Sequence, residues 1–345
     1  LPDLRNEDTP MIAQLSALFV ALAARLEAAA QVAGQAAGLE GAQARLAGRV
    51  AAVRIWHRIL QRDYLPRMCL PGLNVQGLSE LGPDHGPDHG ATPGLAHVPV
   101  ELTHAVLRCG HWMVRSQYRL NDSAPVTMGD LLAGEPDIET RRSQPGSGNF
   151  WRIDWRLFFE MSSLYPPQRA LAMGDGIAAM FGSDLVLPDS IEIHSALVRS
   201  DNDLALRDVT RSLDGGLQRV SMLARRLAPR LKRQHPDWVL WSAARRKAMV
   251  RAWCAAAGVQ GLPRHLIDDP PLYLYLLAEA GAGDPAQGFG NGKTLGALGS
   301  AVLAASINGA IAASAAALPQ TDLPDHALPG ADLDQMPDLI RHLTL

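Results

Sequence analysis

The sequence predicts a mainly helical protein with long loops and little strand. Alanine and leucine dominate the 345 residues, and aromatic residues make up only 5% of them. Both dominant residues have high helix propensity, whereas the two-residue alternation that is typical of strands does not persist anywhere. A chain of this length that is 47% hydrophobic can bury one large core. Length and composition alone allow either one large helical domain over residues 1–345 or two smaller ones.

Charge and cysteine usage narrow the classes of function. The formal net charge is −3, and a charge so near neutral argues against a nucleic-acid role driven by phosphate neutralisation. Cys69, Cys109 and Cys254 show no C-x-x-C spacing, so neither a zinc site nor a disulfide framework is indicated, although one pair could still form. The chain begins with Leu1 and shows no signal-peptide pattern, which fits a processed product or a segment of a longer precursor.

Two long helices are expected in the first part of the chain. The first spans residues 10–31, where Pro10 occupies the first turn and its missing N–H is not needed. The second spans residues 43–65 and should end at Pro66. Residues 71–99 then form a loop insertion that contains the repeat GPDHGPDHG. The His and Asp residues of this repeat could bind a metal, but the frequent glycine and proline favour a solvated loop.

Helical patterns recur after a second loop insertion at residues 121–149. The aromatic stretch Phe150–Leu164 should lie across a core. The apolar run Leu295–Leu318 carries no charge and is long enough to span a bilayer. Its serines and Asn308 would be costly facing lipid, so we expect a buried helix and favour no membrane span. Further helical patterns are a run that ends at Arg230 and two helices at residues 238–257 and 271–282. The C-terminal tail at 319–345 contains a last short helical pattern near residues 336–343.

The stretch Pro99–Asn121 is predicted to be a helix of about six turns, and it contains the most informative histidine. His111 lies among apolar residues, with Arg108 and Arg115 one turn to either side. Such a histidine has two interpretations. It is either a core residue held by a hydrogen bond, the commoner case for buried polar groups, or a metal ligand whose neighbouring arginines meet an anionic group.

Four segments form a recognisable set when they are taken in chain order. They are Leu4–Leu15 (LRNEDTPMIAQL), Trp56–Met68 (WHRILQRDYLPRM), Pro99–Asn121 (PVELTHAVLRCGHWMVRSQYRLN) and Leu204–Leu227 (LALRDVTRSLDGGLQRVSMLARRL). RIDWRLFFE at Arg152–Glu160 and PLYLYLLAEA at Pro271–Ala280 support them, so the set extends over nearly the whole chain. In this order the segments resemble those of the animal-type haem peroxidase superfamily, particularly its bacterial members. The resemblance implies one haem-peroxidase-like helical domain over residues 1–345.

The resemblance implies a haem b cofactor and assigns residues to its proximal side. His111 falls on the position of the axial iron ligand, and neutral imidazole is a common choice for that role. Asp208 stands where the family has Asn and would accept the other ring N–H, which makes the ligand more electron-rich. The alternative is a surface Asp208 paired with Arg207 or Arg211. Arg108 and Arg211 fall on positions that face the haem propionates, whose carboxylates match guanidinium groups.

The distal side is represented by two residues near the start of the chain. Arg5 aligns with the family's distal arginine, a cation that stabilises charge developing on peroxide. Asp8 aligns with a Glu that forms an ester to the haem in some members, although Asp is one methylene shorter. Arg108 stands where the oxygenase branch has a radical-forming Tyr, which favours the peroxidase branch. The implied activity is peroxide-dependent oxidation of a small organic or halide donor.

The resemblance also has gaps. The family's distal histidine and its calcium ligands lie in an upstream segment that has no counterpart here, so we expect no calcium site in this chain. Three explanations stay open: a second protein chain supplies the missing part, haem is bound without peroxidase chemistry, or a haem-free homologue serves as a structural or partner-binding subunit of an assembly. A generic helical binding protein with fortuitous matches is a weaker alternative.

Overall fold

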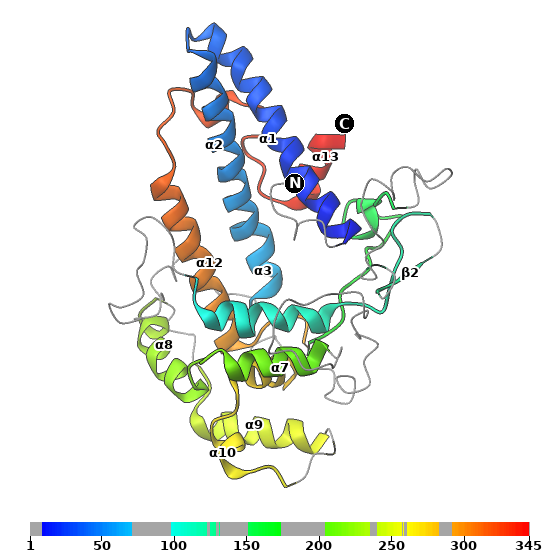
Figure 1. Ribbon diagram of the computed structural model, residues 1–345, viewed down its shortest axis with the longest axis vertical. Coiled ribbons are helices and arrows are strands. Elements are labelled where there is room, and N and C mark those ends of the chain that lie inside the picture. Colours follow the sequence, from blue (N-terminus) through cyan, green and yellow to red (C-terminus); the bar gives the residue numbers. More distant parts are fainter. Residues whose placement is uncertain are drawn as a thin grey trace.

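The computed structural model shows a mainly helical protein, as the sequence predicts (Figure 1). The expected site residues Arg5 and Asp8, the GPDHGPDHG repeat and most of both loop insertions lie outside the residues that the structure describes. The described residues are 9–70, 98–122, 125–128, 131, 151–173, 204–234, 240–256, 258, 261–282 and 292–344.

Within the described residues, most of the regular structure is helical, and two short strands, β1 (Gln117–Tyr118) and β2 (Val126–Thr127), pair antiparallel. The helices are α1 (Pro10–Ala36), α2 (Gly41–Ile59), the π-helix η2 (Leu60–Tyr64), α3 (Leu65–Met68), the π-helix η4 (Leu102–Val106), the 3-10 helix η5 (Leu107–Met113), the 3-10 helix η6 (Trp155–Leu157), α7 (Leu204–Asp214), α8 (Val220–Gln234), α9 (Ala243–Ala256), α10 (Arg264–Asp268), α11 (Leu272–Ala282), α12 (Ala297–Ala317), the 3-10 helix η8 (Asp325–Ala327) and α13 (Met336–Thr344).

Helices α1 and α2 form a hairpin at one end of the molecule (Figure 1). Thr9 caps α1 by accepting a hydrogen bond from the N–H of Ile12 at 3.2 Å, and Pro10 occupies the first turn as expected. The two backbones approach closely, because a Cβ on Gly48 would lie 2.6 Å from Cα of Glu27. Leu22 and Leu26 are fully buried in a core shared with α2 and α13.

The prediction that Pro66 ends the second helix is wrong. The chain passes from α2 through η2 into α3 and stays helical to Met68. In the π turn, the N–H of Leu65 bonds to the carbonyl of Leu60, five residues back. Pro66 then falls in the first turn of α3, where a missing N–H is tolerated. A locally widened turn therefore admits the proline without breaking the helix.

The predicted six-turn helix over Pro99–Asn121 is also wrong in length and type. Its helical part consists of η4 and η5 and ends at Met113, because Val114 has extended backbone with ψ 133°. Beyond it, the chain forms β1, and the N–H of Arg115 donates to the hydroxyl of Tyr118 at 2.9 Å. Leu120 is buried in a small separate core. The residues after Met113 therefore pair as a strand and pack into this second core, and they do not continue the helix.

The largest core surrounds α11 and joins it to η4, α8, α9 and the first half of α12. Residues 297–305 of α12 are all buried. Farther along α12, Asn308 accepts a hydrogen bond from the amide of Gln61 at 3.1 Å. By length and composition, α1 and α12 could each cross a membrane. The first half of α12 packs against protein, whereas residues 312–317 are half-buried or exposed, so burial extends over only part of this helix.

A buried carboxylate fixes the junction between α11 and α12. Glu279 is 0% exposed, and its carboxylate accepts hydrogen bonds from the Tyr275 hydroxyl (2.9 Å) and the N–H groups of Leu298 (3.0 Å) and Gly299 (3.4 Å). Gly296 permits this approach, since a Cβ there would lie 2.2 Å from Cγ of Glu279. Burial raises the pKa of Glu279 to about 7, against the opposing effect of these donors and of Arg246.

This raised pKa predicts that the protein loses stability between about pH 5 and pH 8. The folded state favours protonated Glu279, so its contribution is fully present below the unfolded pKa of 4.5 and disappears as pH rises through about 7. Glu279→Gln keeps the shape of the side chain: its amide oxygen can accept from the two backbone N–H groups, and its NH₂ group can donate to the Tyr275 hydroxyl. We expect this substitution to remove up to about 3 kcal/mol of the pH dependence. Urea unfolding of both proteins at several pH values measures the difference, and parallel stability profiles would contradict it.

Candidate functional site

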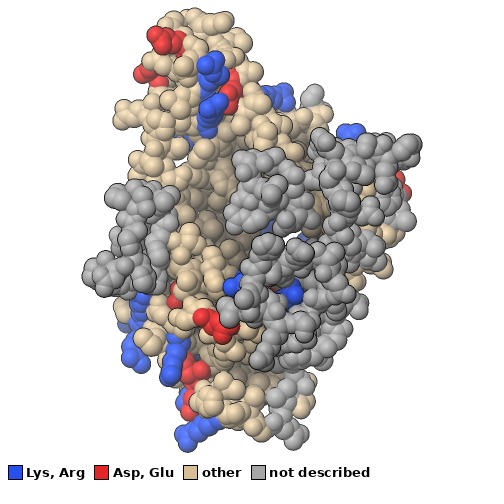
Figure 2. Space-filling model, in the orientation of Figure 1, with Lys and Arg blue, Asp and Glu red and all other residues tan. Residues whose placement is uncertain are grey.

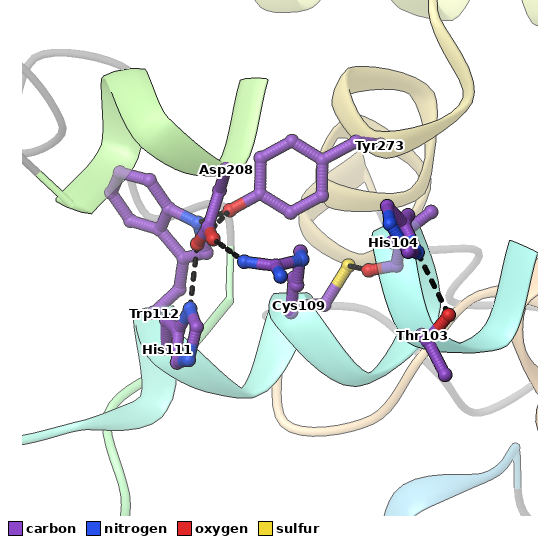
Figure 3. A network of polar contacts seen from close by, with 9 residues as sticks. Thr103, His104, Cys109, His111, Trp112, Asp208 and Tyr273 are labelled. Atoms are coloured by element: carbon purple, nitrogen blue, oxygen red, sulfur yellow. Dashed lines mark hydrogen bonds and ion pairs between the residues drawn. The ribbon is translucent and has the colours of Figure 1, made fainter. Parts of the chain in front are cut away.

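The predicted site residues meet where three segments come together. The 3-10 helix η5 carries Arg108 and His111, α7 carries Asp208, and α11 carries Tyr273 (Figure 3). A 3-10 helix has three residues per turn, so residues i and i+3 lie one above the other. The unexpected geometry of η5 therefore places Arg108 and His111 on the same side, toward α7.

Asp208 is the centre of this network. Its side chain is 0% exposed, and its Oδ1 accepts a hydrogen bond from Nη1 of Arg108 at 2.6 Å. Its Oδ2 lies 2.6 Å from Nδ1 of His111 and 3.2 Å from the hydroxyl of Tyr273, which donates to it. A buried carboxylate is stable only when it is paired and hydrogen-bonded. The three partners meet this requirement on both oxygens.

The contact with Asp208 orients the His111 ring. Because a carboxylate can only accept, Nδ1 carries the hydrogen and Nε2 of the neutral ring keeps its lone pair. The side chain of His111 is 40% exposed, and no described residue hydrogen-bonds to Nε2. The structure thus presents an oriented imidazole with one basic nitrogen available, which is the arrangement that a metal-ligating histidine requires.

Two aromatic residues, which the sequence did not single out, complete the network. The indole N–H of Trp112 donates to the Tyr273 hydroxyl at 2.5 Å, and that hydroxyl donates in turn to Asp208. Burial, followed by the nearby negative charge of Asp208, raises the pKa of Tyr273, so it stays a donor. The available signal was Tyr273 itself, since a tyrosine in an apolar helix usually requires a hydrogen-bond partner.

Cys109 lies next to this network but takes no chemical part in it. The thiol is 0% exposed and bonds to the carbonyl of Ala105 at 3.4 Å. Burial, with a smaller effect of Asp208, raises the pKa of Cys109. A thiol held in this form is neither a nucleophile nor a metal ligand. All three cysteines are free and buried.

His104 occupies the other end of the same helical stretch. Its Nδ1 lies 2.8 Å from the hydroxyl of Thr103 (Figure 3). Burial, together with the positive charges of Arg108 and Arg211, lowers the pKa of His104. Arg211 itself is exposed on α7, and the structure gives it no ion pair with a described residue. The structure therefore brings His111, Asp208 and Arg108 into one network, with Arg211 outside it.

Arg108 is not left entirely free for an external anion. One of its terminal nitrogens is bound to Asp208, whereas its Nε is buried without a hydrogen-bond partner. An unpaired buried donor is unfavourable, so the guanidinium retains capacity for another acceptor. Among the described residues there is no group of three or more His, Cys, Asp or Glu side chains that could hold a metal ion.

Comparison with known proteins identifies no relative. No protein-family model matches the chain, and no curated protein or solved structure matches it either.

Replacing Asp208 should destabilise the protein strongly. Asp208→Ala removes the carboxylate and leaves Arg108 and Tyr273 with unpaired donors, a loss of about 3 kcal/mol for breaking a buried ion pair. Urea unfolding measures this change. Glu160→Ala is the matched control, because the Glu160–Arg169 pair is exposed (60% and 74%) and should contribute less than about 0.5 kcal/mol. Equal effects of the two substitutions would contradict the central role of Asp208.

Proposed function

We propose that this chain binds haem b through Nε2 of His111 and, with a complete distal side, oxidises a small organic or halide donor at the expense of peroxide. The observation that carries the proposal is the 2.6 Å contact between Nδ1 of His111 and the buried Asp208. Metal-ligating histidines usually give their second N–H to such an acceptor. The collinear resemblance to animal-type haem peroxidases supports the same assignment.

The described residues fit haem better than a metal ion bound by protein alone. A porphyrin supplies four nitrogen ligands itself and requires only one or two axial groups from the protein. His111 can supply one, whereas a site made only of protein ligands would require a cluster that the described residues do not contain. The partly exposed guanidinium of Arg108 and the exposed Arg211 could meet the propionates.

Each residue of the network has a definite task in this proposal. Asp208 fixes the tautomer of His111 and increases the electron density of the imidazole. Arg108 balances the charge of Asp208, and Tyr273 restricts the second carboxylate oxygen from moving. When bound, haem supplies the redox chemistry toward peroxide. Arg5 would provide the distal cation and Asp8 a second haem contact; both residues lie outside the described part of the chain.

A second candidate is a catalytically degenerate homologue that acts as a structural or partner-binding subunit. One observation favours it. The residue assigned to a propionate, Arg108, already uses Nη1 in a buried ion pair with Asp208, so the network is internally satisfied to a large extent without any ligand.

Haem reconstitution separates the two candidates. We expect the purified full chain to develop a Soret band with added hemin, and His111→Ala to abolish or shift it because the axial ligand is lost. His104→Ala is the matched control, since His104 lies on the same helical stretch but, among the described residues, bonds only to Thr103. A chain without a Soret band would favour the subunit. An unchanged spectrum in His111→Ala would exclude His111 as ligand.

The charge of Asp208 should also set the reduction potential of the bound haem. A carboxylate next to the axial imidazole favours the oxidised metal, so Asp208→Asn should raise the potential. Asp214→Asn, at the exposed end of the same helix, should leave it unchanged. Potentiometric titration of the reconstituted proteins measures both values, and a shift of equal size in both variants would contradict a direct contact between Asp208 and the ligand.

A further inference from the structure

The near-neutral net charge of the chain conceals an uneven distribution. Residues 219–264 hold 11 of the 32 Lys and Arg residues but only one of the 35 Asp and Glu residues, Asp237. These 46 residues therefore carry a formal charge of +10, and the rest of the chain carries −13. The expectation that nucleic acid is not a partner was based on the net charge of the whole chain, in which these two parts largely cancel. A basic surface on one part of the protein can bind nucleic acid even when the net charge of the whole chain is near zero.

The basic segment forms one end of the molecule. Helices α8, α9 and α10 lie together at the end opposite the α1–α2 hairpin (Figure 1). Lys and Arg side chains follow the left and lower edges of this end (Figure 2). Helix α8 buries Leu223, Leu227 and Leu231 against the core. Its charged residues Arg225, Lys232 and Arg233 are exposed on the outer side. We call the exposed side of residues 219–264 the basic end.

Only part of the positive charge is neutralised within the protein. Asp268 accepts ion pairs from both Lys247 (2.8 Å) and Arg264 (3.3 Å), and Asp269 is bonded to Ser221. Arg245 stacks over the Trp241 ring at 4.4 Å. Asp237 lies outside the described residues.

Five cations at the basic end are exposed and take part in no ion pair with a described residue. They include Arg225 and Lys232, which are two helical turns apart and so project from the same face of α8 about 10 Å from each other. Their charges are not offset by any neighbouring carboxylate on α8 or α9, because neither helix contains Asp or Glu. The five are Arg219, Arg225, Lys232, Arg233 and Arg251.

We propose that the basic end binds the phosphate backbone of nucleic acid. Nine of the 11 cations are arginines, whose planar guanidinium groups bind phosphate oxygens in pairs. The surface is otherwise polar, since Met222 is the only large hydrophobic residue exposed among the described residues of this segment. A bilayer surface or a protein partner would be expected to use exposed apolar side chains at its contact.

The binding should be independent of base sequence. Phosphate contacts fix a protein on the duplex but carry no sequence information. With five unpaired cations, the logarithm of the binding constant should fall with the logarithm of salt concentration at a slope of about −4 to −5, because each neutralised phosphate contributes about −0.9. This inference does not depend on the proposed haem site, which lies on other helices.

Fluorescence anisotropy of the full chain with a labelled duplex DNA of about 20 base pairs tests the proposal across a salt series. The triple variant Arg225→Gln, Lys232→Gln and Arg233→Gln should reduce the magnitude of the slope by about 2 to 3 and weaken binding at low salt at least tenfold. The matched control is Arg45→Gln, Arg49→Gln and Arg341→Gln, which removes the same charge from exposed positions on α2 and α13 and should bind like the parent.

Three results would overturn the proposal: no binding of DNA at low salt, equal weakening in the two triple variants, or binding to phosphatidylserine vesicles but not to DNA. Thermal unfolding of each triple variant accompanies the titrations. Exposed substitutions of this kind change stability little, so a selective loss of binding in a folded variant is the supporting outcome.

Discussion

The buried charge of Asp208 is the constraint on which the centre of this protein depends. An isolated carboxylate at 0% exposure would be strongly unfavourable, so its partners must be in place whenever the chain is folded. These partners come from η5 and α11, far from Asp208 in the sequence. One residue on α7 therefore fixes the relative positions of three segments. The requirement for charge compensation also orients His111, so stability and ligand geometry have the same origin.

The sequence predicts much of the helical content but not the local geometry that forms the site. Propensity and proline positions predict α11, α12 and α13 closely, because each is a regular pattern with a clear end. They predict the start of α1 at Pro10 but not its end, because the helix continues beyond residue 31 to Ala36. They fail over Pro99–Asn121, where the helix is a π turn followed by a 3-10 turn. These departures arise from tertiary contacts around Asp208 and β1, which a local pattern does not contain. The same limitation explains the error at Pro66.

The residues of the candidate site were likewise predicted only in part. The family resemblance places Arg108, His111 and Asp208 in related positions, and the structure brings these three together. The resemblance does not identify Tyr273, which donates directly to Asp208, or Trp112, which reaches Asp208 through the Tyr273 hydroxyl. Nor does it identify Glu279, whose partners are backbone N–H groups of another helix. These hydrogen-bond partners lie on separate helices that pack closely in the folded protein. No fixed separation in the sequence relates them, so a sequence pattern cannot reveal them.

Helix α11 links the two buried carboxylates. Tyr273 and Tyr275 are two residues apart and therefore point to different sides of the helix. One donates to Asp208 at the candidate site, and the other donates to Glu279 at the start of α12. A single helix therefore supplies a hydroxyl donor to each of the two buried carboxylates. The compensation of both buried acids depends on the position of this short, largely buried helix, because Tyr273 and Tyr275 cannot be placed independently of each other.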